Sequence, residues 1–519
     1  MISVIVSAAA SGSFEIITDL QEQTHQDFEV LVAGPSWPCP VSVAGQGIEV
    51  LQDPIPQASK TLALNAALGR ARGEYILTVE SDDRMHPRAL ELLSAAAERA
   101  GDPTAMIIPG FEVMGSIGPA GRPGWTYTPS ETADQLDMIL RATPGPLFLR
   151  SERVRNAGGW PADYPSEGNL YPNLALLMKL LVTDGSISLP ETVFRLRREK
   201  VTSSAEALAW WPIYKFLVAR AAKAIGRLSE VCFDNQYERA TLAGSGKSTS
   251  GASKPLVTAA MAVYNAEPYV RVALESALNQ PYPHTEVIVV DDGSSDRTAA
   301  IVRSYETDRV RLIERTRNSG KGACMNVALD YARGDYLFEL DGDDWLDPDA
   351  TEVYVEAMLK ASPDVACVHG RRRAFFSSGP GDLRFETVFP GRPIKDRYDF
   401  CRRPEALGPR FYRTAWLRAA GGWPADYTSG GTLYEDLALL FRLADRYRFE
   451  YVDQSLYNIR LRPDSVTSRH RQECWPILKE LACQALARWG NEYVPEFEDE
   501  TCSIRLRKAE QPARSRRSR

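Results

Sequence analysis

The chain has 519 residues, of which 44% are hydrophobic and 25% are charged, the profile of an ordinary folded globular protein. This composition excludes a mostly disordered chain and a collagen-like fibre. The formal net charge of -7 excludes a protein that binds nucleic acid mainly through electrostatics, so nucleic acid is not an expected partner. The length corresponds to roughly three average domains or to two large α/β domains.

The N-terminal segment, MISVIVSAAASGSFEII, predicts a first buried strand. Its apolar run is short and has no basic region in front, which argues against a signal peptide. No stretch of 18 consecutive apolar residues occurs, so the sequence predicts no membrane-spanning helix. The eight cysteines form no C-x-x-C pair, which argues against a zinc site and favours reduced thiols in the cytoplasm.

The two halves of the chain repeat one another. The segment AGGWPADY stands at 157–164 and again at 420–427, and LYPNLALLMKLL from Leu170 matches LYEDLALLFRLA from Leu433. An eight-residue identity at corresponding places is not expected by chance. The sequence therefore predicts two copies of one domain, at 1–240 and 255–490.

Residues 241–254 separate the copies and are rich in glycine and serine, which is typical of a flexible linker. Their GSGKST segment is similar to a phosphate-binding P-loop. The full P-loop pattern requires a glycine where this chain has Thr241, with a strand before the loop and a helix after it. We therefore interpret the segment as a linker.

Strands and helices alternate along the second copy. The expected strands are 256–265, 310–315 and two that run into acidic loops within the segments 285–296 and 335–345. The expected helices are 268–280, 297–306, 320–334 and 348–361. We expect the third helix to be closed by a glycine. This alternation predicts an α/β domain with a mostly parallel sheet flanked by helices. Ligands of such sheets bind at the carboxyl ends of the strands, where two acidic loops fall, at 291–296 and 341–344.

The acidic turn at 341–344 has the sequence Asp-Gly-Asp-Asp. In an extended segment, residues two apart project to the same side, so Asp341 and Asp343 can converge. Mg²⁺ and Mn²⁺ prefer carboxylate oxygens and often share their site with substrate phosphates. Acidic turns are also common on surfaces, and the second acidic loop is what strengthens the prediction of a metal site.

Four motifs in order resemble family 2 glycosyltransferases with a GT-A fold. They are AVYNAEPYVRVALESALNQ, EVIVVDDGSSDRT, NSGKGACMNVALDYARGDYLFELDGDDWLDP and the later AGGWPADY with LYEDLALL. The match covers almost all of 255–470 in the family's order. The resemblance implies two tandem GT-A-like domains, the fold of nucleotide-diphospho-sugar transferases.

The resemblance also implies roles for individual residues. Asp292 would contact the nucleotide base, Tyr264 and Asn265 would line its pocket, and three basic residues would hold the diphosphate: Lys321, Arg460 and Arg462. The acidic turn would hold the ribose and a Mg²⁺ or Mn²⁺ ion, with Asp341 towards the ribose and metal, Asp343 on the metal, and Gly342 and Asp344 in support. Asp436, with Glu435 beside it, would be the catalytic base.

These residues fit the chemistry of sugar transfer from a nucleotide sugar, with a UDP-sugar favoured. The departing diphosphate needs a cation and basic groups, and the acceptor hydroxyl needs a base. One base opposite the leaving group implies a single displacement with inversion, without the nucleophilic carboxylate of retaining hydrolases. The acceptor is left open between a glycan, a lipid-linked saccharide, a peptide and a small molecule.

Several residues have structural alternatives. Asp292 can instead cap the following helix, and Glu435 with Asp436 can be ordinary acids at a helix start. Arg460 and Arg462 can be surface basic residues. Trp423 can pack in the core or form a wall for the acceptor sugar.

The first copy lacks most of these side chains. Its counterpart of the first acidic loop is VAGPS at 32–36, and its acidic turn reads Glu80-Ser81-Asp82-Asp83. Pro172 and Asn173 replace the Glu435-Asp436 pair, so no carboxylate remains there. We expect a degenerate domain without activity, whose open roles are acceptor binding, a homodimer face, or metal binding through Asp82 and Asp83.

The C-terminal extension, 491–519, ends in a strongly basic stretch. From Arg505 to Arg519 it contains seven basic residues and one acid, Glu510. The expected structure is a disordered, solvated tail. The alternative is contact with an anionic membrane surface, which would place the protein at the inner face of the membrane.

Two other functions compete with a single-site transferase. A two-site glycan polymerase would use both copies, and the loss of acids at Pro172-Asn173 argues against it. A non-catalytic protein that binds glycans or nucleotides is opposed by the intact acidic turn and by the Glu435-Asp436 pair.

Overall fold

The computed structural model describes most of the chain, namely residues 1–7, 15–34, 48–52, 60–100, 104–114, 125–127, 146–165, 172–181, 185–197, 204–235, 239–242, 254–379, 382–404, 407–431, 433–463, 465 and 471–509. It divides into two compact units at Thr249/Ser250, with Ser377–Phe385 grouped with the first. This division falls in the linker segment. The GSGKST segment, which is similar to a P-loop, lies outside the described residues.

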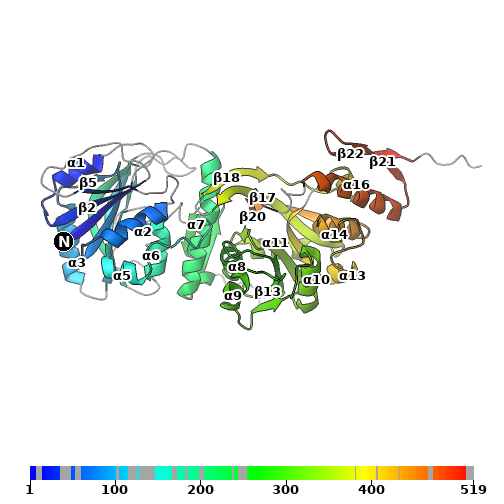
Figure 1. Cartoon of the computed structure of the whole chain (residues 1–519), viewed down its shortest axis with the longest axis horizontal. Coiled ribbons are helices and arrows are strands. Elements are labelled where there is room, and N and C mark those ends of the chain that lie inside the picture. Colours follow the sequence, from blue (N-terminus) through cyan, green and yellow to red (C-terminus); the bar gives the residue numbers. More distant parts are fainter. Residues whose placement is uncertain are drawn as a thin grey trace, which may run out of the picture. The chain divides into compact units, whose positions relative to one another are not determined.

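The sheet of the second unit, drawn in green and yellow in Figure 1, combines a parallel half with a mixed half. In order, its strands are β14 (Val310–Glu314), β13 (Thr285–Asp291), β12 (Val257–Val263), β15 (Tyr336–Asp341), β19 (Gly408–Arg413), β17 (Val365–Gly379), β20 (Arg448–Leu461) and β16 (Trp345–Leu346), with β18 (Asp382–Phe389) beside β17. The first four are parallel, whereas β19 runs antiparallel to β15. The predicted α/β class is confirmed, and the sheet is more mixed than expected.

The first four helices of the second unit fall within the ranges that the sequence predicts, and the later ones had no predicted ranges. In chain order, the helices are α8 (Val270–Leu278), α9 (Thr298–Arg303), α10 (Lys321–Tyr331), α11 (Ala350–Lys360), α12 (Arg397–Arg402), α13 (Thr414–Ala419), α14 (Glu435–Leu443) and α16 (Arg471–Arg488). Every residue of β13 is buried, as expected for a strand with both faces covered.

The expected glycine closure of α10 is wrong. The helix ends at Tyr331, and Ala332 already has an extended backbone. Gly334 instead allows the segment before β15 to lie close to β12, because a β-carbon there would lie 2.6 Å from the backbone nitrogen of Thr258.

The first unit has the same strand order. Its strands are β3 (Ile48–Gln52), β2 (Phe28–Gly34), β1 (Ile2–Ser7), β4 (Tyr75–Glu80), β8 (Leu147–Arg150), β6 (Thr104–Met114), β9 (Gly185–Arg197) and β5 (Arg84–Met85), with β7 (Trp125–Tyr127) beside β6. Its helices are α1 (Glu15–Gln21), α2 (Lys60–Arg70), α3 (Ala89–Ala100), α5 (Ser151–Asn156), α6 (Pro172–Leu181) and α7 (Ser204–Ala224).

A buried polar network recurs at the amino end of both sheets. In the second unit the hydroxyl of Thr258 donates to Glu286 (2.7 Å), which also accepts from the backbone and side chain of Arg333 (2.7 Å each). The first unit repeats these bonds among three corresponding residues, Ser3, Glu29 and Arg72. The shared strand order and the shared hydrogen-bond network together support our proposal that the two units are duplicates.

Each unit continues into a helix followed by a two-stranded hairpin. In the first, α7 precedes β10 (Val231–Asp234) and β11 (Arg239–Leu242); in the second, α16 precedes β21 (Tyr493–Glu498) and β22 (Ser503–Lys508). The expected solvated tail is therefore wrong for Arg505, Arg507 and Lys508, which lie in β22, and Arg507 pairs with Glu496 (2.8 Å). Residues 510–519 lie outside the described part.

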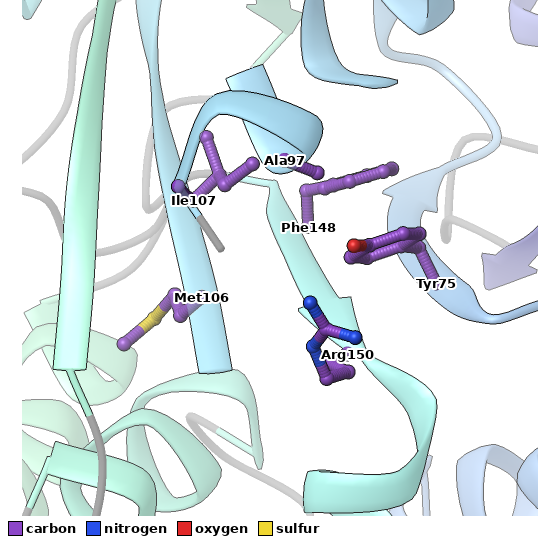
Figure 2. Close-up of a pocket in the computed structure, with 7 residues that line it drawn as sticks. Tyr75, Ala97, Met106, Ile107, Phe148 and Arg150 are labelled. Atoms are coloured by element: carbon purple, nitrogen blue, oxygen red, sulfur yellow. The ribbon is translucent and has the colours of Figure 1, made fainter. Parts of the chain in front are cut away.

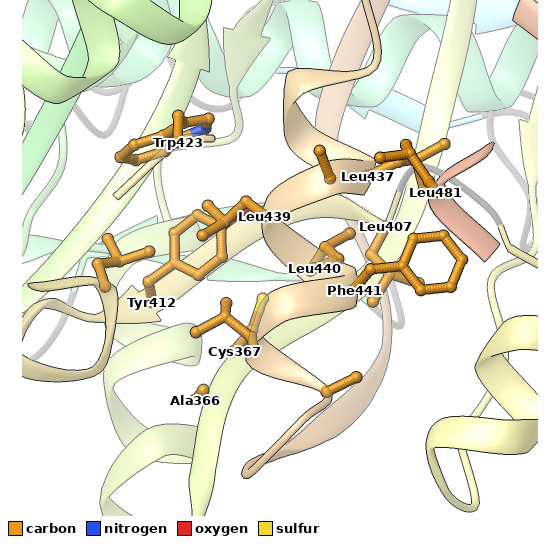
Figure 3. Close-up of a cluster of buried hydrophobic side chains, with 14 of the residues drawn as sticks. Ala366, Cys367, Leu407, Tyr412, Trp423, Leu437, Leu439, Leu440, Phe441 and Leu481 are labelled. Atoms are coloured by element: carbon orange, nitrogen blue, oxygen red, sulfur yellow. The ribbon is translucent and has the colours of Figure 1, made fainter. Parts of the chain in front are cut away.

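The hydrophobic core of the second unit fixes α14 in place (Figure 3). Leu437, Leu440 and Phe441 of this helix are buried in one cluster with Tyr412 and Trp423. Trp423 is 2% exposed and meets Tyr412 edge-on, so core packing is its confirmed role, rather than a wall for a sugar. Packing of α14 thereby places its first turn, which carries Glu435 and Asp436.

The hollow shown in Figure 2 lies in the first unit, between Tyr75, Phe148 and Arg150 on one side and Met106 and Ile107 on the other. Its volume of about 10 Å³ is close to the space of one water molecule. It is too small for a nucleotide or a sugar.

Among the helices that the structure describes, none combines the length and the apolar character needed to cross a bilayer.

Candidate functional site

The acidic loop after β13 is tied to the loop before α10. The carboxylate of Asp292 is buried and accepts hydrogen bonds from the backbone of Ser319 (3.0 Å) and Gly320 (2.8 Å). The alternative in which Asp292 caps the next helix is wrong, because Asp296 accepts from the backbone of Thr298 at the start of α9 instead. Asp292 therefore holds the loop that leads into Lys321.

The Tyr264-Asn265 turn follows β12 and lies beside the same acidic loop. Asn265 has a positive φ of 46°, which asparagine tolerates better than most residues. Its backbone donates to the Ser294 hydroxyl and its side-chain oxygen accepts from the backbone of Ser295, both at 2.9 Å. Tyr264 remains 51% exposed, as a large ring available to a ligand.

The acidic turn after β15 places its carboxylates against basic side chains. Asp343 accepts from both Nε and Nη2 of Arg462 (3.0 Å each), and Asp344 accepts from the backbone of Arg460 (2.8 Å). Gly342 permits close packing there, since a β-carbon would lie 2.8 Å from Val263. The structure thus brings together the acidic turn and the basic segment that lies more than a hundred residues later.

Negative charge accumulates at this turn. Burial raises the pKa of Asp343, with Arg462 opposing the shift, and burial together with the charges of Asp343 and Asp341 raises the pKa of Asp344 well above its usual value. Carboxylates whose ionised form is disfavoured in this way would be stabilised by an added cation.

The two predicted basic residues of β20 and its end are not ordinary surface groups, so that alternative is wrong. Arg460 is 5% exposed and donates from Nε to the backbone oxygen of Asp343 (3.2 Å). The guanidinium groups of Arg460 and Arg462 lie over the ring of Tyr269, at 4.7 and 4.9 Å from its centre. This stacking fixes two positive charges beside the acidic turn.

Lys321 begins α10 and lies among carboxylates. Its ammonium is 2.5 Å from Asp341, 3.0 Å from Glu339 and 3.7 Å from Glu435. Burial opposes the charged form, but these acids raise the pKa of Lys321 well above its usual value. Lys321 therefore links the acidic turn to the first turn of α14.

Glu435 lies at the first position of α14, as expected for an acid at a helix start, and is almost fully buried. Burial raises its pKa to about 7, although the nearby Lys321 ammonium opposes the shift. Tyr434, just before it, adopts the left-handed conformation with φ 57°. Such backbone strain is often found where a side chain must be aimed precisely.

Asp436 has a different environment from its neighbour. It accepts from Nη1 of Arg410 (2.8 Å), while Nε and Nη2 of the same guanidinium donate to the two oxygens of Glu339 (2.9 and 2.7 Å). Burial opposes ionisation of Glu339, but Arg410 and Lys321 lower its pKa to about 2. One arginine thus joins a strand acid to a helix acid.

The donor set suits a hard divalent cation that shares its site with a ligand. Within the described residues, no group of three or more acidic, histidine or cysteine side chains forms a complete metal site. Mg²⁺ and Mn²⁺ are commonly held by one or two carboxylates plus phosphate oxygens, and Asp341 and Asp343 supply that pair. The raised pKa of Asp343 fits this assignment.

The first unit replaces most of this charged group. Where β15 pairs Glu339 with Arg410, β4 pairs Thr78 with Leu147. Asn173 of α6 donates to the Thr78 hydroxyl (3.3 Å). The corresponding ion pair that persists joins Lys60 and Glu80 (2.7 Å).

Sequence reasoning missed three residues of the site. Glu339 stands two positions before Asp341 on one strand, so the alternation of a strand was an available signal for it. Tyr269 and Arg410 carried no signal, because their roles depend on segments far away in the chain.

A larger hollow of the second unit, about 710 Å³, lies near Arg309, Tyr331 and Arg333. These residues are at the amino ends of the parallel strands, away from the acidic turns. It is an open, polar surface depression without the carboxylate cluster described above.

The fold and the site define an α/β protein with a cluster of acidic and basic side chains at the carboxyl ends of parallel strands. Residues 258–406 match the model of glycosyl transferase family 2. This part of the second unit therefore matches a family 2 glycosyltransferase domain, the family that its motifs resemble.

Two curated relatives show the extent of the likeness. A chondroitin synthase of Escherichia coli is 39% identical over 121 residues, which is 23% of this chain and 17% of the relative. The succinoglycan biosynthesis protein ExoO of Rhizobium meliloti is 38% identical over 130 residues, 24% of this chain and 37% of the relative. The match thus spans well under half of each relative's length.

Among solved structures, TarS of S. aureus in complex with UDP-GlcNAc is similar at 21% identity, over 44% of this chain and 66% of that chain, with a TM-score of 0.37.

Proposed function

We propose that the second unit is an inverting, metal-dependent glycosyltransferase that moves a sugar from a nucleotide sugar to an acceptor hydroxyl. One observation carries this proposal. Lys321 contacts both Asp341 of the acidic turn and Glu435 of α14, so a donor site and a base site adjoin one another.

The proposed donor is a nucleotide sugar, with a UDP-sugar favoured. We assign Tyr264 and Asn265 to the nucleotide pocket, and Asp292 would support this pocket because it holds the loop before α10. Arg460 and Arg462 are the proposed partners of the diphosphate. Their charges lie at the acidic turn, where a phosphate would bind next to the metal.

Asp341 and Asp343 would hold a Mg²⁺ or Mn²⁺ ion, with Asp344 in support. A bound cation would stabilise the negative charge that develops on the departing diphosphate. Lys321 and Arg462 contribute positive charge to the same region from the protein itself.

We assign the base to Asp436, because a second residue orients it. Catalytic bases are commonly fixed by a further group, and Arg410 binds one oxygen of Asp436 at 2.8 Å. The carboxylate would accept the proton of the acceptor hydroxyl as the new glycosidic bond forms. Glu435 is the alternative base, favoured by its pKa of about 7, near the value that is best for proton transfer at neutral pH.

The acceptor is proposed to be a growing glycan, since two matched relatives are named for polysaccharide synthesis. A lipid-linked saccharide, a peptide or a small molecule are the other acceptors.

The first unit is proposed to be a non-catalytic duplicate, because Thr78, Leu147 and Asn173 replace the charged group. The cytoplasm, with the basic end near a membrane surface, is the proposed location.

A donor screen tests this function without an acceptor. Saturation-transfer NMR across nucleotide sugars should identify the donor, and slow donor hydrolysis should require Mn²⁺ or Mg²⁺ and stop on chelation. Asp436→Asn should abolish turnover and keep nucleotide affinity. Binding without hydrolysis across the panel would instead indicate a non-catalytic binding protein, and loss in Glu435→Gln alone would move the base to Glu435.

A further inference from the structure

We propose that Arg410 is a positioning residue that aims the carboxylate of Asp436, and that Glu339 anchors Arg410 for this purpose. The inference rests on the proposed function, since it concerns the base of the same reaction. Arg410 lies on β19, outside the four motifs that define the family resemblance, and belongs to a different segment from either of the two carboxylates that it binds.

Arg410 binds two carboxylates at once, those of Glu339 and Asp436, and we call this group of three residues the clamp. Two nitrogens, Nε and Nη2, donate to the two oxygens of Glu339 in a bidentate pair (2.9 and 2.7 Å). This pair uses one edge of the guanidinium and fixes its plane. The remaining nitrogen, Nη1, donates to the backbone oxygen of Leu407 (3.2 Å) and to Asp436 (2.8 Å).

Burial makes this clamp rigid. The side chain of Arg410 is 9% exposed and that of Glu339 is fully buried. A buried guanidinium with all three nitrogens engaged cannot change rotamer without breaking several charged hydrogen bonds. The position of Asp436 is therefore determined by β15 and β19, in addition to its own helix.

The first unit shows what happens without the clamp. There the indole N–H of Trp160 donates to Asn173 (3.0 Å), the residue that corresponds to Asp436. In the second unit the corresponding indole, Trp423, is buried, and its N–H has no hydrogen-bond partner among the described residues. Asp436 is thus bound by Arg410, whereas Asn173 is bound by the tryptophan, and the indole N–H of Trp423 is left unsatisfied among the described residues.

An unsatisfied buried N–H destabilises the folded state, so the exchange of partners is not a gain in stability by itself. It is explained if the orientation that Arg410 imposes on Asp436 is the one that the reaction needs. The orientation found in the first unit, with residue 173 held by Trp160, accompanies the loss of the carboxylate.

Two variants with a matched control test the proposal in the full chain, by donor turnover and donor affinity. Arg410→Lys keeps the positive charge but cannot form the bidentate pair with Glu339. The double variant Glu339→Thr with Arg410→Leu copies Thr78 and Leu147 of the first unit, and leaves no buried charge unpaired within this pair. Arg413→Lys is the control, because Arg413 lies on the same strand but donates to backbone oxygens of Met358 and Val365 and lies over the ring of Tyr336, away from Asp436.

We expect kcat to fall on the order of 100-fold in both Arg410 variants, as for a misplaced catalytic group. In Arg410→Lys, which leaves the contact between Glu339 and Lys321 in place, KM for the donor should stay within about threefold of wild type. Added to Asp436→Asn, the same changes should have no further effect. The Arg413→Lys control should keep wild-type kcat. Circular dichroism and donor binding by NMR identify any variant that fails to fold, and the other variant then decides.

Wild-type kcat in a folded Arg410 variant would overturn the proposal. So would equal losses in kcat and in donor affinity in Arg410→Lys, because a general structural defect would affect both. These outcomes differ from failure of the proposed function, in which the wild-type protein itself turns over no donor or Asp436→Asn retains turnover.

Discussion

The buried carboxyl group of Glu435 should make the stability of the second unit depend on pH, and this dependence can be measured. Its pKa is about 7 in the folded protein, against 4.5 for an unperturbed glutamate. The folded state therefore binds the proton more tightly than the unfolded state. The resulting stabilisation is fully present below about pH 4.5 and is lost as the pH rises through 7.

The size of this effect follows from the shift. At 1.36 kcal/mol for each pKa unit, a shift from 4.5 to about 7 corresponds to about 3 kcal/mol between the two ends of the window. Glu435→Gln cannot ionise and should not lose this amount. Relative to wild type, we expect the variant to gain about 2 kcal/mol of unfolding free energy between pH 5 and pH 8.

Urea unfolding of the metal-free and nucleotide-free protein measures this difference. Hydrogen exchange of peptides from α14 restricts the readout to the second unit. Asp436→Asn is the matched control, since Asp436 is bound by Arg410, and the variant should lose stability at both pH values. A Glu435→Gln effect of the same size at pH 5 and pH 8 would refute the link between burial and the raised pKa.

Two further predictions concern the duplication and the backbone. Asp343→Ala should reduce turnover at least 100-fold, whereas Asp82→Ala at the corresponding place of the first unit should leave it nearly intact; equal losses would favour a two-site polymerase. Gly334→Ala should lower the unfolding free energy of the second unit by roughly 1–3 kcal/mol, because the new β-carbon would lie 2.6 Å from a backbone atom. The control Gly69→Ala in α2, where nothing lies within 4 Å of the new β-carbon, should not lower the stability of the protein. An unchanged melting temperature for Gly334→Ala would contradict the close approach.

The sequence by itself determined the class of fold and most of the donor side of the site. Apolar runs that alternate with helical periodicity predicted β12, β13 and β15 with their helices, because these patterns are local. The acidic turns at Asp292 and Asp341–Asp344 were visible for the same reason, since each follows directly from the end of a strand.

Only the tertiary structure decided how the acids are divided between tasks. Glu435 and Asp436 are neighbours in the sequence, yet one lies buried near Lys321 and the other is bound by Arg410. Their different environments come from β15, α10 and β19, which are brought together by the sheet. Charge, burial and pKa depend on such neighbours in space, and no local pattern in the chain encodes them.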